Sequence, residues 1–281
     1  MTSTGHRPVV SPGGDLPYRL VATDLDGTLL TPAETVSDRT REALAGVVSA
    51  GAQHIIVTGR SAAWARPVFD EIGYTGIAVC GQGAQVYDAG AHRLLTSLTL
   101  DRRLAAVALA KIEAEVGPLL VAANEDGLDG RVLAAPGFRL RIGTELPVEW
   151  AAAGELLANP VAKLYIQHPE LGDDELADAA RRLAGDLVGV VMAGPGVVEL
   201  LPPGLSKATG LAVAALRLGV KGARTIAFGD MPNDIPMFSW AAYGVAMGGA
   251  HEQLRAVADE VTAGNDADGV AVVLERVFGL N

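Results

Sequence analysis

The sequence predicts an α/β fold in which a doubly wound parallel sheet, with helices on both faces, is interrupted by an inserted α/β domain. Two regions, one near each end of the chain, alternate short apolar runs with longer segments of helical period, the pattern of a parallel sheet covered by helices. The segment between them has a different texture, with turn residues at both edges. A chain of 281 residues has room for two domains.

The first region predicts a βαβ unit. Residues 19–22 are an apolar run typical of a strand, and residues 37–50 have helical period, with Ser37 as the N-cap candidate and Gly51 after the end. Residues 54–57 are the next apolar run. Because such crossovers are right-handed, we expect two neighbouring parallel strands with the helix on one face of the sheet.

The second region lies near the C-terminus and extends the same sheet. We expect a helix over residues 206–218, a strand over 224–228, the start of a helix over 237–242, and short strands over 244–247 and 260–262. Together, the two regions predict a Rossmann-like core.

The middle segment predicts the insertion. Residues 85–90 have the pattern of a hairpin turn, and strand-like and helical pieces follow as far as Met192. Turn residues lie at both edges, near Asp88 and at Gly194-Pro195-Gly196, as is typical of linkers. We therefore expect a core of residues 18–87 and 193–281, an inserted domain of residues 88–192, and a flexible tail over residues 1–17.

The composition argues against two classes of partner. A chain with 49% hydrophobic and 20% charged residues is typical of a packed globular protein. The 33 acidic and 22 basic residues give a formal charge of −11, which disfavours a nucleic-acid-binding or anionic-membrane surface. A phosphate would therefore have to be bound by local cations or backbone N–H groups.

The cellular compartment is indicated by cysteine use and hydropathy. The single cysteine, Cys80, excludes an intramolecular disulfide and fits a reducing compartment. We expect it to be buried, because it ends the apolar run 76–80. The N-terminal residues lack the apolar region of a signal peptide, and no window approaches the roughly 18 apolar residues of a membrane span. These features predict a cytoplasmic protein.

Polar clusters follow the predicted strands, where open α/β sheets bind ligands. In Asp24-Leu25-Asp26-Gly27-Thr28, residues two apart in extended chain point the same way, so Asp24 and Asp26 can face one site. Gly27 permits a sharp turn. An isolated Asp-x-Asp pair after a strand is as consistent with a purely structural role, as a turn and a helix cap, as it is with a functional site.

Three further clusters favour a site. Thr58-Gly59 ends the second strand and offers a hydroxyl and an N–H group to a phosphate. Ser206-Lys207 places a cation at the positive end of a helix. The segment Gly229-Asp230-Met231-Pro232-Asn233-Asp234 follows a strand and adds two carboxylates and an amide.

The carboxylates predict a cation. Asp24, Asp26, Asp230 and Asp234 would repel one another around one pocket unless a divalent cation were bound. Oxygen ligands in small number, with room for water and a substrate phosphate, suit Mg²⁺.

In this order, the clusters resemble the four motifs of the haloacid dehalogenase superfamily: Asp24-x-Asp26-Gly27-Thr28, Thr58, Lys207 and Gly229-Asp230-x-x-Asn233-Asp234. Within that superfamily, the sequence is similar to the Cof-type phosphatases, whose type IIB cap domain lies between the second and third motifs. The resemblance runs from about Leu20 to Val277 and includes residues 245–248 and 265–271. One departure is Gln82, where that family usually has Asn.

The resemblance implies a Mg²⁺-dependent phosphatase of small phosphorylated metabolites, such as sugar phosphates or phosphorylated cofactors. It implies that Asp24 attacks phosphorus and becomes an aspartyl phosphate, while Asp26 protonates the leaving group and then activates water. Lys207 would screen the repulsion between carboxylate and phosphate.

The other roles also follow from the resemblance. The metal ligands would be Asp24, Asp26 through its backbone carbonyl, and Asp230. The phosphate would be bound by Thr58, Gly59, Lys207 and Asn233, with Asp234 in support. The inserted domain would close over the site and select the substrate, so we expect no nucleic-acid or membrane partner. Nothing in the sequence indicates an oligomeric state.

Three alternatives differ in class. A sugar-phosphate mutase would share the nucleophile, and its products would distinguish it. A phospho-accepting receiver module would have no use for Asp26 and needs only ~120 residues, without an insertion. A nucleotide-binding loop at Gly81-Gln82-Gly83 lacks the third glycine, which is replaced by Val86, and precedes a hairpin instead of a helix.

Overall fold

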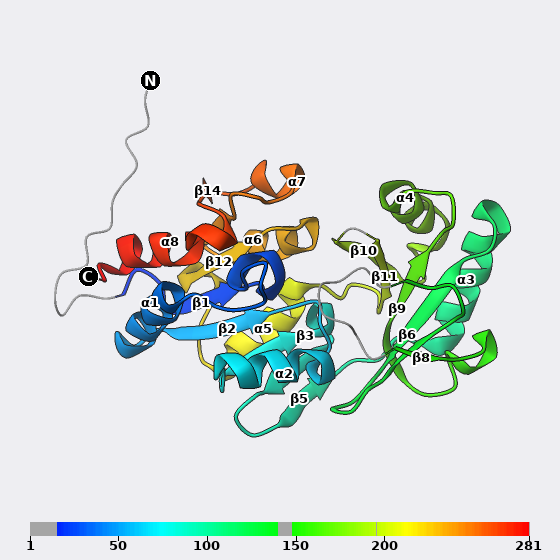
Figure 1. The fold of residues 1–281 in the computed structure, drawn as a ribbon, viewed down its shortest axis with the longest axis horizontal. Helices are drawn as coiled ribbons and strands as arrows, with labels where there is room; N and C mark the ends of the chain where they lie inside the picture. The colour runs from blue at the N-terminus through cyan, green and yellow to red at the C-terminus, as the bar shows by residue number, and fades with distance from the viewer. Residues whose placement is uncertain (1–15, 140–147, 195, 281) are drawn as a thin grey trace.

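The computed structural model describes residues 16–139, 148–194 and 196–280, which build two sheets side by side (Figure 1). The first sheet takes its strands from both ends of the described chain, and the second takes its strands from the middle. The tail expected over residues 1–17 lies outside the described residues except for Leu16 and Pro17.

The strand order of the first sheet is β14-β13-β12-β1-β2-β3-β4-β5. Six strands run parallel: β1 (Leu20–Thr23), β2 (Gln53–Val57), β3 (Ile77–Cys80), β12 (Thr225–Gly229), β13 (Tyr243–Ala246) and β14 (Glu260–Val261). β4 (Gln85–Asp88) runs antiparallel to both β3 and β5 (Arg93–Ser97). The chain builds outward from β1 in both directions, so the strand order reverses between β1 and β12. Doubly wound sheets bind their ligands at such a reversal.

The register brings three loop starts to one edge. Thr23 of β1 pairs with Ile56 of β2 on one side and with Phe228 of β12 on the other. The segments that follow these strands therefore leave the sheet at its carboxyl edge, next to one another.

Helices cover both faces of the first sheet because neighbouring strand residues point to opposite sides. Val21 packs on the face of α1 and α8, whereas Leu20 and Ala22 pack on the face of α5, α6 and α7. Ile56 packs with α2. The helices are α1 (Asp38–Ser49), α2 (Ala62–Ile72), α5 (Lys207–Arg217), α6 (Ile235–Trp240), α7 (Glu252–Arg255) and α8 (Gly269–Phe278).

The expected N-cap at Ser37 is confirmed, and Ser206 also proves to be an N-cap, so that its helix begins at Lys207. The side-chain oxygens of Ser37 and Ser206 accept hydrogen bonds from the N–H groups three residues later, at 3.1 and 3.3 Å, and each satisfies one free donor of its helix. The helix expected over residues 237–242 begins earlier, at Ile235. Pro236 lies in its first turn, where a missing N–H breaks no helical hydrogen bond.

The hairpin expected over residues 85–90 lies further along the chain. Residues 85–88 form β4, with Val86 and Tyr87 buried in the sheet, and the connection to β5 runs over residues 89–92. His92 adopts a φ of 47° in this connection. Val86 and Tyr87 favour a strand because their side chains are buried in the sheet, so the turn begins only after Asp88.

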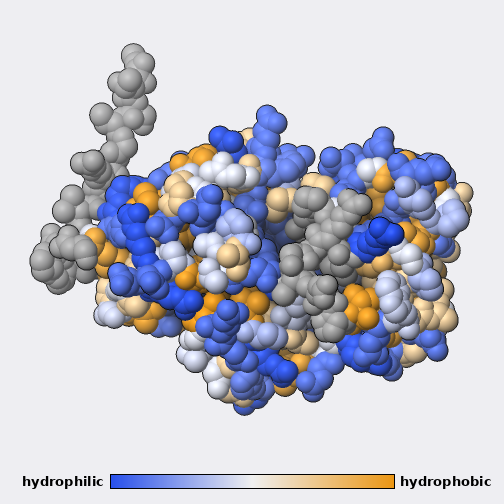
Figure 2. All heavy atoms as spheres, in the orientation of Figure 1, coloured by the Kyte–Doolittle hydropathy of each residue, from blue (hydrophilic) through white to orange (hydrophobic). Residues whose placement is uncertain are grey.

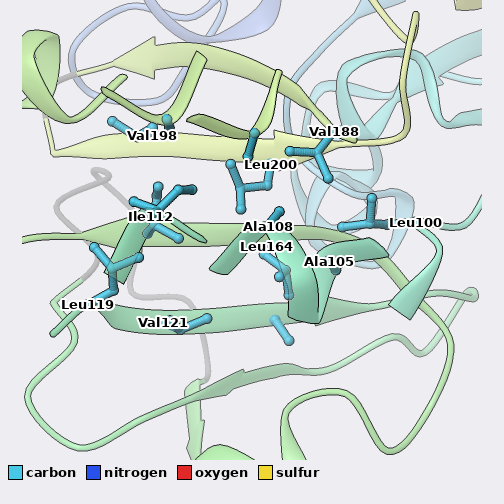
Figure 3. Close-up of a cluster of buried hydrophobic side chains, with 14 of the residues drawn as sticks. Leu100, Ala105, Ala108, Ile112, Leu119, Val121, Leu164, Val188, Val198 and Leu200 are labelled. Carbon is cyan, nitrogen blue, oxygen red and sulfur yellow. The ribbon is translucent and has the colours of Figure 1, made fainter. Parts of the chain in front are cut away.

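The second sheet has the strand order β10-β11-β9-β6-β7-β8. Its elements are α3 (Arg102–Val116), β6 (Leu120–Glu125), β7 (Val132–Ala134), β8 (Val148–Trp150), β9 (Val161–Gln167), α4 (Asp173–Ala184), β10 (Gly189–Gly194) and β11 (Val197–Leu201). α3 and α4 lie on the side that faces away from the first sheet (Figure 1). Figure 3 shows the core beneath them, in which Ile112, Leu164 and Leu200 meet.

The chain passes from one sheet to the other at positions that differ from the domain boundaries predicted from the sequence. β5 begins at Arg93 and belongs to the first sheet, although the insertion was expected from residue 88. β11 ends at Leu201 and belongs to the second sheet, although the core was expected to resume at residue 193. Asp88 ends the first strand of the β4–β5 hairpin, and Gly194 ends the first strand of the β10–β11 hairpin. Turn residues indicate a hairpin as readily as a linker, because both have the same local composition. The division into domains itself remains a prediction.

The surface in Figure 2 is largely hydrophilic, with scattered apolar patches. Cys80 is buried at the end of β3, as expected. Among the described helices, none has the length and apolar character needed to cross a membrane.

Two glycines let α5 approach the turn over Gly81–Gly83. A Cβ atom on Gly210 would lie 2.6 Å from the Cα atom of Gly83, which is too close for any side chain. We expect Gly210→Ala to lower the free energy of unfolding by about 1–3 kcal/mol, because the contact becomes overpacked. Urea unfolding followed by circular dichroism measures the change.

Gly154→Ala is the matched control, since a Cβ atom there meets nothing within 4 Å. Equal stability of the Gly210→Ala and Gly154→Ala variants would contradict the close packing of α5.

Candidate active site

The acidic and basic groups predicted from the sequence meet at the carboxyl edge of the first sheet. Asp24 directly follows β1, Asp230 directly follows β12, and Lys207 is the first residue of α5. The strand reversal between β1 and β12 brings these segments together, although Asp24 and Asp230 are far apart in the sequence.

Lys207 is the central group of the site. Its Nζ donates to Oδ1 of Asp24 at 2.6 Å and to Oδ1 of Asp234 at 2.7 Å. All three side chains are buried. Because Ser206 caps α5 just before Lys207, the backbone direction of the lysine is set by the helix start.

The turn over Pro232–Asp234 holds Asp234 in place. Oδ2 of Asp234 accepts from the backbone N–H groups of Asp230 and Met231, both at 3.1 Å. With Oδ1 bound to Lys207, both carboxylate oxygens have donors. Asp234 therefore positions the ammonium group rather than reaching into the pocket.

Burial and mutual repulsion shift the charges of this site. Burial raises the pKa of Asp24 well above its usual range; Lys207 opposes the rise, and Asp234 and Asp230 add to it. Burial also raises the pKa of Asp230 to about 7, with Asp234 adding to the rise. Burial alone would lower the pKa of Lys207, but Asp234 and Asp24 outweigh it, so the net pKa is raised and the ammonium stays charged.

The carboxylates fit a divalent cation. One oxygen each from Asp24, Asp230 and Asp234 lies within 4.8 Å of the others. Gly27, with a φ of 77°, makes room for this group, since a Cβ atom there would be 2.3 Å from Oδ2 of Asp230. The Thr28 hydroxyl donates to Oδ1 of Asp230 at 3.4 Å. Hard oxygen ligands of this kind suit Mg²⁺ or Ca²⁺.

Asp26 lies at the same edge, but its carboxylate is turned toward Arg60. Arg60 Nε donates to Oδ2 of Asp26 at 2.9 Å, and Nη2 makes a further, shorter contact. The side chain of Arg60 is buried, stacks on Trp64 at 4.7 Å from the ring centre, and also reaches Glu34. Sequence reasoning gave Arg60 no role, although it directly follows Thr58-Gly59.

Thr58 and Gly59 form the loop beside Asp26. Thr58 is fully buried, and its hydroxyl accepts from the N–H of Arg60 at 3.1 Å. A hydroxyl that accepts one bond can still donate its proton to a phosphate oxygen. The carbonyl of Gly59 accepts from Nζ of Lys163 at 2.7 Å.

Asn233 is paired with Gln82. Its Nδ2 donates to Oε1 of Gln82 at 3.1 Å, whereas its Oδ1 is buried and has no partner among the described residues. The phosphate-binding role expected for Asn233 stays a prediction.

Lys163 and Glu199 were also missed. Each is the one charged residue in its strand, Val161–Gln167 or Val197–Leu201, and has apolar neighbours on both sides. A lone charge in such a run is a signal, because a buried charge needs a partner.

A cavity of about 310 Å³ opens beside Lys207 and Asn233. Its other wall comes from the second sheet, including Val191 and Met192 of β10. The site therefore adjoins a space large enough for a small organic group.

Comparison with known proteins agrees with this arrangement. A family model described as haloacid dehalogenase-like hydrolase matches residues 21–274. The 5-amino-6-(5-phospho-D-ribitylamino)uracil phosphatase YitU of Bacillus subtilis is 31% identical over 277 residues, which cover 94% of this chain and 98% of that protein. The pyridoxal phosphate phosphatase YbhA of Escherichia coli is 28% identical over 263 residues, which cover 90% and 96% of the two chains.

A solved structure gives the same result. A haloacid dehalogenase-like hydrolase from Bacteroides thetaiotaomicron superimposes with a TM-score of 0.72 at 26% identity, covering 93% of this chain and 100% of that chain. With the carboxylate and lysine cluster at the predicted edge, the chain belongs to the haloacid dehalogenase-like hydrolases and is a phosphatase of the Cof type.

Proposed function

We propose that this enzyme hydrolyses phosphate monoesters of small metabolites with the help of Mg²⁺ and through a phosphorylated Asp24. The observation that carries the proposal is the buried Asp24 carboxylate at the strand reversal, held by Lys207, which itself lines the cavity.

In the first step, a carboxylate oxygen of Asp24 attacks phosphorus, a new O–P bond forms, and the bond to the leaving oxygen breaks. Asp26 donates a proton to that oxygen, so the product leaves as an alcohol. In the second step, water attacks the aspartyl phosphate and gives its proton to Asp26. Inorganic phosphate leaves and the Asp24 carboxylate is restored.

Asp26 must rotate away from Arg60 to perform this acid–base role. In the structure, the Arg60 guanidinium engages both carboxylate oxygens of Asp26. Because 42% of the Asp26 side chain is exposed, it has room to turn toward the leaving group.

The phosphate would be bound by groups that surround Asp24. Lys207 supplies the positive charge, the Thr58 hydroxyl and the Gly59 N–H supply donors, and Asn233 supplies its amide. Asp234 keeps Lys207 directed at the site through their 2.7 Å contact.

Asp24 and Asp230, with the backbone carbonyl of Asp26, would hold Mg²⁺, and Asp234 lies within reach of the same cluster. A bound Mg²⁺ would lower the repulsion between these carboxylates and an anionic substrate. Its positive charge would also favour the ionised form of Asp24, whose pKa burial raises.

The substrate would be a small phosphorylated metabolite. The relatives act on a phosphorylated ribitylamino-uracil and on pyridoxal phosphate, as their names state. A cavity of about 310 Å³ between the two sheets suits a leaving group of that size and is too small for a nucleic acid. A cytoplasmic location stays a prediction from the sequence.

Asp24→Asn should lower phosphate release by roughly 10⁴-fold or more, because the nearly isosteric amide cannot act as the nucleophile. The measurement is inorganic phosphate released from a panel of sugar phosphates, pyridoxal phosphate and flavin mononucleotide. The control is Asp129→Asn, whose side chain is 92% exposed. Activity within about tenfold of the unmodified enzyme would remove Asp24 from this role.

Asp26→Asn should lower kcat by about 10²–10⁴-fold with poor leaving groups, because the departing alkoxide then lacks a proton donor. An aryl phosphate, whose leaving group needs no proton, should lose much less in the first step. Single-turnover kinetics separates the two steps. An equal loss for both kinds of substrate in the first step would show that Asp26 is not the acid.

Removing divalent cations with EDTA should abolish turnover, and adding Mg²⁺ should restore it. The acidic cluster repels an anionic substrate unless a cation is bound. Isothermal titration of Mg²⁺ into the metal-free enzyme should show one site that is weakened in Asp230→Asn. Full activity in metal-free buffer would refute the metal site.

A further inference from the structure

A continuous set of buried polar contacts ties the second sheet to the phosphate-binding loops of the first. Nζ of Lys163 on β9 donates to the Gly59 carbonyl at 2.7 Å and forms an ion pair with Glu199 on β11. Oε2 of Glu199 accepts from Nε2 of Gln82 at 2.8 Å, and Oε1 of Gln82 accepts from Asn233. We call these five residues the Lys163–Glu199 network.

Packing alone does not account for this network. Lys163 is 0% exposed and Glu199 2% exposed, so both charges have lost their hydration. A buried ion pair gains little stability over apolar residues of similar size, since desolvation offsets the attraction. Neighbours of both residues on the same strands, such as Leu164 and Leu200, are apolar and pack in the core under α3 and α4.

Lys163 and Glu199 each have a second partner in a loop of the first sheet. Lys163 uses its ammonium group on the backbone of Gly59, next to Thr58, and Glu199 uses its second oxygen on Gln82. Separation of the sheets would break both of these contacts while the ion pair itself stayed intact. The network is therefore complete only when the second sheet lies against the first.

The backbone around Gln82 is shaped for this contact. Gln82 is 1% exposed and adopts the left-handed conformation, with φ 60° and ψ 21°, which is unusual for a residue with a side chain. Its amide passes directly over Gly59, where a Cβ atom would lie 2.6 Å from Nε2 of Gln82. The side chain spans from Asn233 to Glu199, and an Asn would be one methylene shorter.

We propose that Gln82, Lys163 and Glu199 are positioning residues that hold the Gly59 loop and Asn233 in their phosphate-binding geometry when the second sheet covers the site. The inference rests on the proposed function, because it assigns phosphate binding to Gly59 and Asn233. The second sheet thus helps to assemble the phosphate pocket in addition to walling the cavity.

The inference predicts a loss that does not depend on the leaving group. The network contacts the phosphate-binding loops, whereas a residue that contacts the leaving group would change the ranking of substrates. We expect Glu199→Gln and Gln82→Asn each to weaken binding of inorganic phosphate by roughly tenfold, the size of one hydrogen bond to a charged group. kcat/KM should fall by a similar factor for every phosphate ester tested.

The experiment uses the full chain with Mg²⁺ and titrates inorganic phosphate by calorimetry. The Glu199→Gln, Gln82→Asn double variant should lose little more than the worse single variant, because both changes break one network. Glu125→Gln is the control, since Glu125 lies on the same sheet and contacts Arg131 and Asn159 there. Circular dichroism at the assay temperature verifies that each variant is folded.

A second measurement is independent of activity. Hydrogen exchange reports the amides of Gly81 and Gln82, which donate to the carbonyls of Arg60 and Thr58 at 2.7 and 3.2 Å. Their exchange should become at least about tenfold faster in Glu199→Gln and stay unchanged in Glu125→Gln. Unchanged exchange in a folded Glu199→Gln variant would overturn the network's positioning role.

The two readouts separate two kinds of failure. Faster exchange with unaltered phosphate affinity would refute the positioning of phosphate while leaving the proposed phosphatase activity in place. If the unmodified enzyme neither bound phosphate nor released it from any ester, the proposed function and the phosphate-positioning inference resting on it would both fail. Hydrogen exchange would then still show whether the network orders these loops.

Discussion

The site depends on one buried ammonium group, that of Lys207, which lies between the carboxylates of Asp24 and Asp234. Without its charge, those two buried anions would face a third at Asp230, and an uncompensated buried charge costs several kcal/mol. The backbone fixes each partner: Ser206 caps the helix that Lys207 begins, and Asp234 is bound by the N–H groups of its own turn. The ammonium position follows from these constraints, and with it the orientation of the proposed nucleophile.

The strand order explains why such a cluster can form from distant segments. β1 and β12 are neighbours, and the chain leaves both at the same edge, so Asp24 and Asp230 meet without a long loop. The tight backbone turn at this edge then sets how closely the carboxylates of the site approach one another. Gly27 turns the chain with a positive φ, and the absence of a side chain there makes room for the Asp230 carboxylate. Carboxylates placed this close repel one another when all are ionised, so a bound cation would stabilise their ionised form.

The second sheet contributes to the site in two ways. Val191 and Met192 on its β10 strand line the cavity beside the catalytic cluster, where a leaving group would lie. Lys163 and Glu199 contact Gly59 and Gln82, in the loops proposed to surround the phosphate. If the second sheet closes over the site as expected, it would exclude water there, which strengthens electrostatic interactions. The two strands that carry Lys163 and Glu199 pack on the apolar core under α3 and α4 (Figure 3).

The sequence by itself determined the features that depend on local signals. Apolar periodicity indicated the α/β class, and the predicted start of a helix at Ser206 placed Lys207 at its positive end. Only the tertiary structure decided the contacts between residues far apart in the sequence, because their spacing along the chain does not indicate which of them meet. Asp26 pairs with Arg60, and Asn233 pairs with Gln82. The structure also shows which strands each sheet contains, which turn residues alone do not reveal, because a hairpin and a linker use the same turn residues. The strand order of the first sheet selects these partners, because the loops after β1, β2, β3 and β12 leave that sheet at the same edge. A buried polar group then binds whichever group the fold places beside it.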